Sequence, residues 1–242
     1  MKSLSEYIVE GIFDVDDNIK NIDKQIKEDI KKFLKENFTG ASNCKISKNP
    51  NNNGKYEVST RSNIEVDNKN ITSLTNDFFV WKEVGGRFIC NSCSSLTSLK
   101  GAPERVGGNF YCNYCNSLTT LEGAPERVGG NFVCENSHLL KSLEGAPKEV
   151  NGSFYCCGCK SLTTLEGSPT KVSKSFDCRY CDSLKSLKGS PKEVNGSFDC
   201  RRCISLKSLE GAPKEVGGDF YCDEEFRDDV KTVCNVAGQI IS

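Results

Sequence analysis

The chain is poor in histidine, in net charge and in long apolar segments. Its single histidine, His138, has no serine or cysteine partner that the sequence makes evident, so nucleophilic catalysis is not indicated. A formal net charge of -1 gives no basic signature for nucleic acid. No apolar run approaches the roughly 18 residues of a membrane-spanning helix. No pair of acidic residues stands out either, so we expect a non-enzymatic binding protein without a cofactor, and without nucleic acid or a membrane among its partners.

The start of the chain does not read as a secretory signal. Glu6 and Glu10 interrupt it, and it has no continuous apolar segment. We therefore expect a reducing compartment, in which cysteines remain thiols. This matters because cysteine is abundant, with 15 among 242 residues.

A unit of 22 residues repeats from Phe88 to Asp219 almost without drift. In each unit a phenylalanine is followed two residues later by a cysteine, and then by a leucine pair, a proline and a valine. One such coil cannot bury its own apolar face, so a fixed period of this length predicts a solenoid of stacked coils. The phenylalanines that mark the repeat are Phe88, Phe110, Phe132, Phe154, Phe176, Phe198 and Phe220.

Within one coil, Phe110 and Cys112 alternate with polar neighbours, which is the period of a short strand. Stacked coils would bring these strands into a parallel sheet with a spacing of about 4.8 Å. Leu118 and Leu121 then enter the core after a turn, and Gly123 permits left-handed backbone angles at the next bend. The expected fold is a solenoid with one parallel sheet of short strands along its length.

The second unit places its apolar residues in the order Val106, Phe110, Cys112, Cys115 and Leu118. This order resembles the leucine-rich repeat family, and most of all its short bacterial and phage variants of the type F-x-C-x-x-C-x-S-L-T-x-L. The resemblance extends over about residues 64–222 and departs in a longer valine-to-phenylalanine spacing and an extra glycine pair. It implies a leucine-rich-repeat-like solenoid whose outer, usually concave, sheet face is available for binding.

The two ends of the chain depart from the repeat. Isoleucines at helical spacing predict a helix over about residues 17–37, and residues 45–58 are typical of a hairpin with a longer loop. Residues 224–234 predict a short closing helix. The expected organisation is a propeptide over 1–10, a cap of helix plus hairpin over 11–63, the repeat solenoid over 64–219 and a C-terminal cap over 220–242.

The cysteine spacing leaves three interpretations open. Cys93, Cys112 and Cys115 satisfy the spacing of a zinc ribbon, and disulfides between stacked coils are geometrically conceivable. In one unit, however, Ser137 replaces the second cysteine without compensation, and a set of metal ligands would not lose a member in this way. The resemblance to leucine-rich repeats implies that the second cysteine satisfies backbone groups inside the coil. We therefore expect buried structural thiols and no metal ligands. Cys157 is expected at an outward position and more reactive than the rest, with an inert surface thiol as the alternative.

Outward positions beside the first cysteine vary between units, whereas the framework positions hardly change. Tyrosine and arginine, which are favoured anchors of protein interfaces, gather there. The alternative is drift at positions that no core constrains. Mixed-sign pairs near the proline turn, such as Lys148-Glu149, are typical of a solvated face. We expect a protein-binding face made by Tyr111, Tyr114, Tyr155, Asp177, Arg179, Tyr180, Asp199, Arg201 and Arg202.

The start of the chain, Met-Lys-Ser-Leu-Ser-Glu-Tyr-Ile-Val-Glu-Gly, resembles the capsid-targeting peptide of internal head proteins in large tailed bacteriophages. Ile8, Glu10 and Gly11 match the prohead-protease site of that family. The resemblance implies a protein packaged in the phage head interior, cleaved after Glu10 and delivered to the host cytoplasm, where it binds a host or virion protein and counters host defence. The alternatives are an ordinary amphipathic helix start on an unpackaged cytosolic scaffold, or a zinc- or thiol-stabilised repeat protein.

Overall fold

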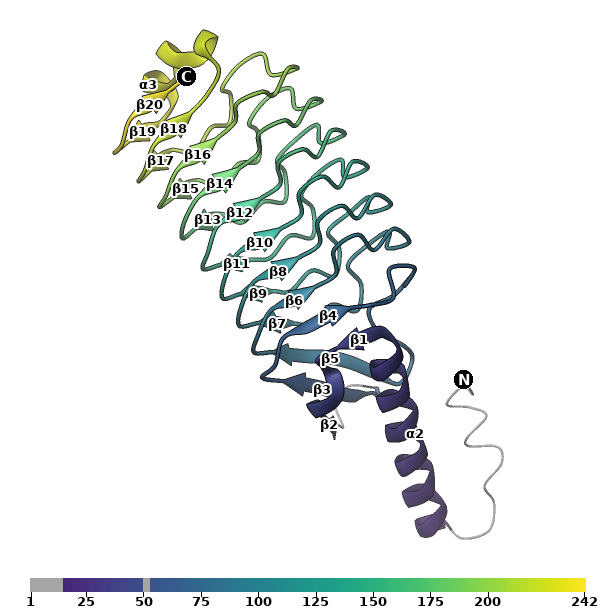
Figure 1. The fold of residues 1–242 in the computed structure, drawn as a ribbon. Coiled ribbons are helices and arrows are strands. Elements are labelled where there is room, and N and C mark those ends of the chain that lie inside the picture. The colour runs from purple at the N-terminus through teal and green to yellow at the C-terminus, as the bar shows by residue number, and fades with distance from the viewer. Residues whose placement is uncertain (1–14, 50–52) are drawn as a thin grey trace.

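The computed structural model describes residues 15–49 and 53–242, and these form a β-solenoid of about 8 turns with a helix at each end (Figure 1). The predictions of a solenoid, of 22-residue coils, of parallel strands and of terminal helices are confirmed. Ile8, Glu10 and Gly11, the expected processing site, lie outside the described residues.

Each coil contributes one strand to each of two 10-stranded sheets. Sheet A is built on the phenylalanine strands that the sequence predicts, and sheet B on the valine that ends each unit. Strands pair in register in both sheets, so Phe132 lies beside Phe154 and Val128 beside Val150. The prediction of one sheet missed sheet B, because one buried valine after an exposed charged residue is too short a pattern to show a strand period.

Most strands have two residues, because each coil turns again at once. In spatial order sheet A comprises β1 Phe38–Thr39, β4 Ile64–Val66, β6 Phe88–Ile89, β8 Phe110–Tyr111, β10 Phe132–Val133, β12 Phe154–Tyr155, β14 Phe176–Asp177, β16 Phe198–Asp199, β18 Phe220–Tyr221 and β20 Ile240–Ile241. Sheet B comprises β19 Asn235–Val236, β17 Glu215–Val216, β15 Glu193–Val194, β13 Lys171–Val172, β11 Glu149–Val150, β9 Arg127–Val128, β7 Arg105–Val106, β5 Phe79–Val84, β3 Tyr56–Thr60 and β2 Lys45–Lys48.

A column of phenylalanine rings runs through the core behind sheet A. From Phe88 to Phe220 the centroids of successive rings lie between 5.1 and 5.5 Å apart, and every ring is fully buried. Such aromatic pairs contribute about 0.5–1.5 kcal/mol each beyond the burial of their area. The leucines, valines and cysteines of the repeat complete one continuous core. Identical residues therefore stack on identical residues along the axis.

A polar side chain before each phenylalanine joins neighbouring coils. Asn109 Oδ1 accepts the backbone N–H of Asn131 at 2.8 Å, and Asn131 Oδ1 accepts that of Ser153 at 2.8 Å. Further along, the Ser153 hydroxyl oxygen accepts the N–H of Ser175 at 3.2 Å. The asparagines and serines at this position thus satisfy backbone donors where the chain turns between the sheets.

The bend after the leucine pair requires glycine, as the sequence predicts. Gly123 has a φ of 87°, and a Cβ there would lie 2.5 Å from the Lys100 Cα of the preceding coil. Close by, the Leu121 N–H donates to the Glu144 carbonyl of the following coil at 3.1 Å. Backbone hydrogen bonds therefore link the coils outside the strands as well.

At the N-terminal end, α2 (Val15–Asn37) and the antiparallel β2–β3 hairpin precede the repeat (Figure 1). Both elements were predicted from the sequence, and both predictions are confirmed. The apolar stripe of α2 is buried at Ile26, Ile30 and Leu34. β1 pairs antiparallel with β4, which ends the parallel stack of sheet A.

At the C-terminal end, η2 (Glu224–Phe226) and α3 (Arg227–Val233) occupy the predicted closing helix. They replace the leucine-rich part of a coil, and Val230 enters the core in its place. β19 and β20 follow and extend both sheets by one more strand. None of the helices in the described part of the chain is both long and apolar enough to cross a membrane.

Asp23 connects α2 to the hairpin. Its carboxylate lies 2.7 Å from Lys27 Nζ and 2.5 Å from Lys48 Nζ, and it accepts a hydrogen bond from the Tyr56 hydroxyl. Burial raises the pKa of this carboxyl, but the hydrogen bonds from Lys27, Lys48 and Tyr56 outweigh burial and hold the pKa well below its ordinary value. The helix is therefore attached to the hairpin by a charge-dependent contact in addition to its apolar stripe.

We predict that this contact contributes to stability at neutral pH and is lost in acid. The folded-state pKa of Asp23 is depressed, so its contribution is present above the unfolded value of about 4 and disappears as pH falls through the folded value. Asp23→Asn should therefore lower the urea midpoint at pH 7 and have a much smaller effect near pH 2. A loss of equal size at both values would show that the charge of Asp23 is not involved.

Candidate binding surface

The second cysteine of each coil has a hydrogen-bonding role inside the solenoid. The Cys115 thiol donates to the Cys90 carbonyl of the preceding coil at 3.1 Å. In the unit without that cysteine, the Ser137 hydroxyl donates to the Cys112 carbonyl at 3.3 Å. Serine replaces cysteine here because both provide a short donor for the same buried carbonyl. The break in the cysteine series, which a metal ligand set would not tolerate, thus has a structural explanation.

The thiols are free, and most are buried. Burial raises the pKa of Cys90 and of Cys112 well above the ordinary value, so both remain protonated thiols. Over residues 15–49 and 53–242, no group of three or more histidine, cysteine, aspartate or glutamate side chains is placed to hold a metal ion.

Cys157 is the thiol expected to be more reactive than the rest. It is half-buried, and burial followed by the negative charges of Glu135 and Asp177 raises its pKa well above the ordinary value. A thiol reacts through its thiolate, so a raised pKa slows alkylation and oxidation. The raised pKa favours the alternative of an inert surface thiol, whereas partial exposure distinguishes Cys157 from the buried thiols, so greater reactivity than theirs stays a prediction.

We predict that the native protein at pH 8 reacts with a thiol reagent at Cys44 and Cys157 at most, and slowly, since burial raises the pKa of Cys44 to about 11. In denaturant, without reductant, all 15 thiols should react. Colorimetric thiol titration measures both numbers, and metal analysis of the same sample should find no stoichiometric zinc. Fewer thiols in denaturant would indicate disulfides, and zinc with chelator-induced unfolding would contradict the structural-thiol interpretation.

On the outer face of sheet A, the predicted binding residues form ladders. Tyr111, Val133 and Tyr155 lie beside one another in successive strands, and Asp177, Asp199 and Tyr221 continue the row. These side chains are half-buried or buried, with Asp177 only 6% exposed. The row packs against itself, so its members present much less surface than the sequence pattern indicates.

The charged part of this face is an internal ion-pair chain. Arg179 Nη2 lies 2.8 Å from Asp177 Oδ2, and Arg179 Nε lies 3.4 Å from Asp199 Oδ2 in the next coil. Arg201 Nη2 lies 2.6 Å from Asp199 Oδ2, and its guanidinium stacks 4.5 Å from the centroid of the Tyr221 ring. The structure brings these predicted residues together, but they hold one another in place.

Tyr114, Tyr180 and Arg202 occupy a different location. They lie in the turn that follows sheet A, where each has a positive φ, of 57°, 57° and 61°. The tyrosine side chains are 53% and 52% exposed, and Arg202 is exposed as well. Asn136 and Gly158 occupy the same turn position in two other coils. The predicted residues therefore divide into an ion-paired sheet face and an exposed turn.

Two exposed apolar residues in the turn that follows immediately along the chain were missed by the sequence analysis. Leu139 is 49% exposed and Ile204 is 80% exposed. The available signal was that other coils carry serine, asparagine or aspartate at these positions, such as Ser117 and Asp182. We call the exposed set along this edge of the solenoid the corner ridge, and it consists of Tyr114, Leu139, Tyr180, Arg202 and Ile204.

The side chains of sheet B form the solvated face that the sequence predicts. Charges of both signs lie along it, and some neighbouring coils form ion pairs, with Lys171 Nζ 2.5 Å from Glu193 Oε2 and Arg127 Nε 3.4 Å from Glu149 Oε2. These pairs are largely exposed, and such pairs contribute little to stability. Sheet B thus provides matched control positions for substitutions on the corner ridge.

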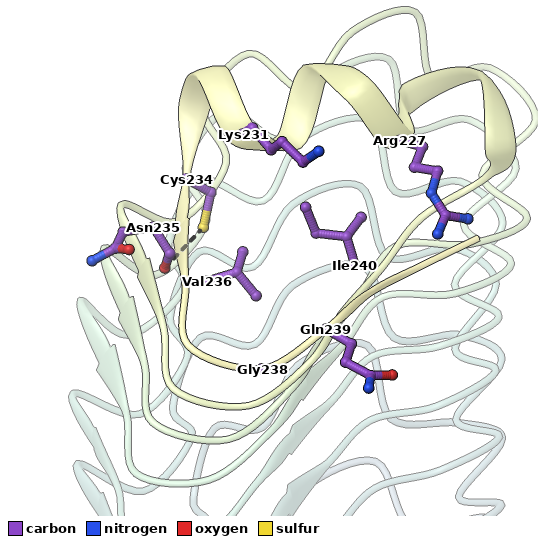
Figure 2. A pocket seen from close by; sticks show the side chains of 8 residues that line it. All are labelled: Arg227, Lys231, Cys234, Asn235, Val236, Gly238, Gln239 and Ile240. Carbon is purple, nitrogen blue, oxygen red and sulfur yellow. Dashed lines mark hydrogen bonds between the residues drawn. The ribbon is translucent and has the colours of Figure 1, made fainter.

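Two other features offer no comparable arrangement. His138 Nδ1 lies 3.0 Å from the Gly158 carbonyl oxygen, a structural contact between coils. A hollow of about 610 Å³ opens beneath α3, where Val236 and Ile240 project into it and Arg227 and Lys231 border it (Figure 2). Its lining comes from the last coil alone and brings together no group of reactive side chains.

Comparison of the chain with protein-family models, with curated proteins and with solved structures gives no match.

Proposed function

We propose that this protein is a non-enzymatic protein-binding repeat module whose partner contacts the corner ridge. The observation that carries the proposal is the presence of exposed tyrosines at left-handed backbone positions. A non-glycine residue in that conformation costs roughly 1–2 kcal/mol, and an exposed ring recovers little of this through burial. Asparagine and glycine tolerate the conformation better, and the chain uses them in other coils.

The ridge also has the composition of an interface. Tyrosine and arginine dominate the residues that contribute most to protein binding, and exposed leucine and isoleucine add apolar area. Four of these side chains, each from a different coil, lie along one edge of the solenoid, whereas sheet B carries none of the large exposed apolar residues of the described chain. Clustering on one edge favours selection for binding over drift.

The ion-pair chain on sheet A then has a supporting role. Asp177 and Asp199 fix the side chains of Arg179 and Arg201 beside the ridge. Fixed neighbours reduce the conformational entropy that a binding surface loses on association. Tyr111 and Tyr155 line the same face and extend the contact area towards the first coils.

We predict that Tyr114→Asn combined with Tyr180→Asn abolishes partner binding while the unfolding free energy stays the same or rises by up to about 1 kcal/mol. Asparagine suits the left-handed turn, so a loss of binding cannot be attributed to misfolding. Affinity capture from a lysate of host cells, quantified by mass spectrometry, should identify proteins retained by the wild type and by Arg127→Ala on sheet B, but lost by the double variant. Identical capture by all three proteins would favour drift.

The proposal includes an origin and a location. The leucine-rich-repeat pattern of the short bacterial and phage type, together with the start of the chain, supports a bacteriophage protein packaged in the head and delivered to the host cytoplasm, where binding a host protein would counter host defence. A virion protein is the other class of partner. Both statements rest on sequence resemblance, because Ile8, Glu10 and Gly11 lie outside the described residues.

Packaging predicts a defined product. The protein recovered from purified phage particles should begin at Gly11, because cleavage follows Glu10 in the matching pattern. Intact-mass measurement of particle-associated protein tests this, with Glu10→Gln as the control that should remain full-length. Absence of the protein from particles would exclude the packaging part of the proposal and leave the binding part standing.

A further inference from the structure

A hollow of about 340 Å³ adjoins the C-terminal part of the corner ridge. Its lining includes Arg179, Tyr180, Arg201, Arg202, Asp223 and Glu224. Tyr180 and Arg202 come from the strained turns of successive coils, and the two other arginines come from the ion-pair chain of sheet A. The hollow is therefore where the exposed ridge meets the fixed guanidinium groups.

The arginines retain unused hydrogen-bond donors. Arg179 and Arg201 contact Asp177 and Asp199 through Nε and Nη2, and within the described residues Nη1 of each has no partner. The Arg202 side chain is exposed and forms no ion pair with any residue that the structure describes. A guanidinium presents five N–H donors in a fixed plane, so one engaged edge leaves the other available.

The carboxylates of the hollow are already engaged. Asp223 accepts the backbone N–H of Arg202 at 3.0 Å. Glu224 accepts the Ser242 hydroxyl and lies 3.7 Å from Arg227 Nη1. The donors that have no partner among the described residues, Nη1 of Arg179 and of Arg201 together with the Arg202 guanidinium, suit an acceptor group with two oxygens.

The charges define what kind of ligand fits. Three arginines line the hollow with Asp223, Glu224 and Ser242, and Asp177 and Asp199 beneath it offset Arg179 and Arg201, so the arginines face four carboxylates and the hollow has no positive excess. Directed hydrogen bonds rather than a long-range field would select the ligand, which disfavours a polyanion such as nucleic acid. A second copy of this surface would place arginines against arginines.

We propose that this hollow is a carboxylate-binding subsite that receives an aspartate or glutamate side chain of the partner protein. The inference rests on the proposed function, because the subsite forms one end of the corner ridge. Arg202 makes the principal contact, with Nη1 of Arg179 and Arg201 and the Tyr180 hydroxyl as further donors. Neighbouring apolar groups of the same partner segment then cover Tyr180 and Ile204.

A peptide selection on the full chain tests this subsite. A displayed library of random linear peptides is panned against the intact protein, and the selected sequences are synthesised. We expect them to share an aspartate or glutamate next to an apolar residue. Replacement of that acid by its amide should weaken binding to the wild type about tenfold or more, as should Arg202→Ala with the original peptide.

The two changes should not add. The amide peptide should bind the Arg202→Ala variant about as strongly as it binds the wild type. A combined loss no larger than either single loss identifies a direct contact between the acid and Arg202. Arg202→Lys should restore binding only in part, because a single ammonium cannot reproduce the bidentate geometry. Arg127→Ala, an exposed arginine on sheet B, should leave binding unchanged, and circular dichroism confirms that each variant is folded.

The outcomes separate this inference from the proposed function. Peptides that depend on Tyr114 and Tyr180 but on neither an acid nor Arg202 would contradict the carboxylate subsite and leave the binding ridge intact. Peptides that depend on none of these residues would overturn both. If the loss of binding free energy from removing the acid adds fully to the loss from Arg202→Ala, the acid contacts another part of the protein and the subsite is rejected.

Discussion

In-register stacking of near-identical coils is the constraint on which the rest of the structure depends. Each phenylalanine lies on a phenylalanine about 5.3 Å away, as Phe110 does on Phe132, and each asparagine or serine before it meets the backbone of the next coil. A displacement of one residue in any coil would move every apolar side chain to the wrong face. Precise register in the core is thus what places the turns of successive coils along a single edge.

Because the coils stack in fixed register, some positions require a particular kind of residue for folding and others do not. Inside the coil, a short donor is required, and both Cys115 and Ser137 meet that requirement. On sheet A, Asp177 and Arg179 satisfy each other. In the turn after sheet A nothing demands a large side chain, yet Tyr114 is there with a positive φ. A residue that costs stability without serving the core is the strongest local indication of function in this chain.

The sequence predicts the repeat architecture well because its periodic signals are local and recur seven times over. The helix over 17–37, the hairpin and the glycine at Gly123 follow from spacing and turn chemistry. Sheet B was not predicted, since one valine per coil carries no period. The candidate site was predicted in composition but not in geometry: the pairing of Asp177 with Arg179 and the left-handed turn at Tyr180 depend on how coils stack, and no pattern within one unit encodes them.

The most direct test is to change the spacing of the ridge while preserving its residues. Deleting Leu140 through Ser161 removes one 22-residue period, keeps all five residues of the corner ridge and brings Tyr180 nearer to Tyr114 by one coil, about 4.8 Å. Each coil contacts only its neighbours, so the shortened protein should fold with an unchanged circular dichroism signature per residue. The account predicts that partner binding is lost, because the anchors no longer match their contacts. Full binding by a well-folded deletion variant would contradict it.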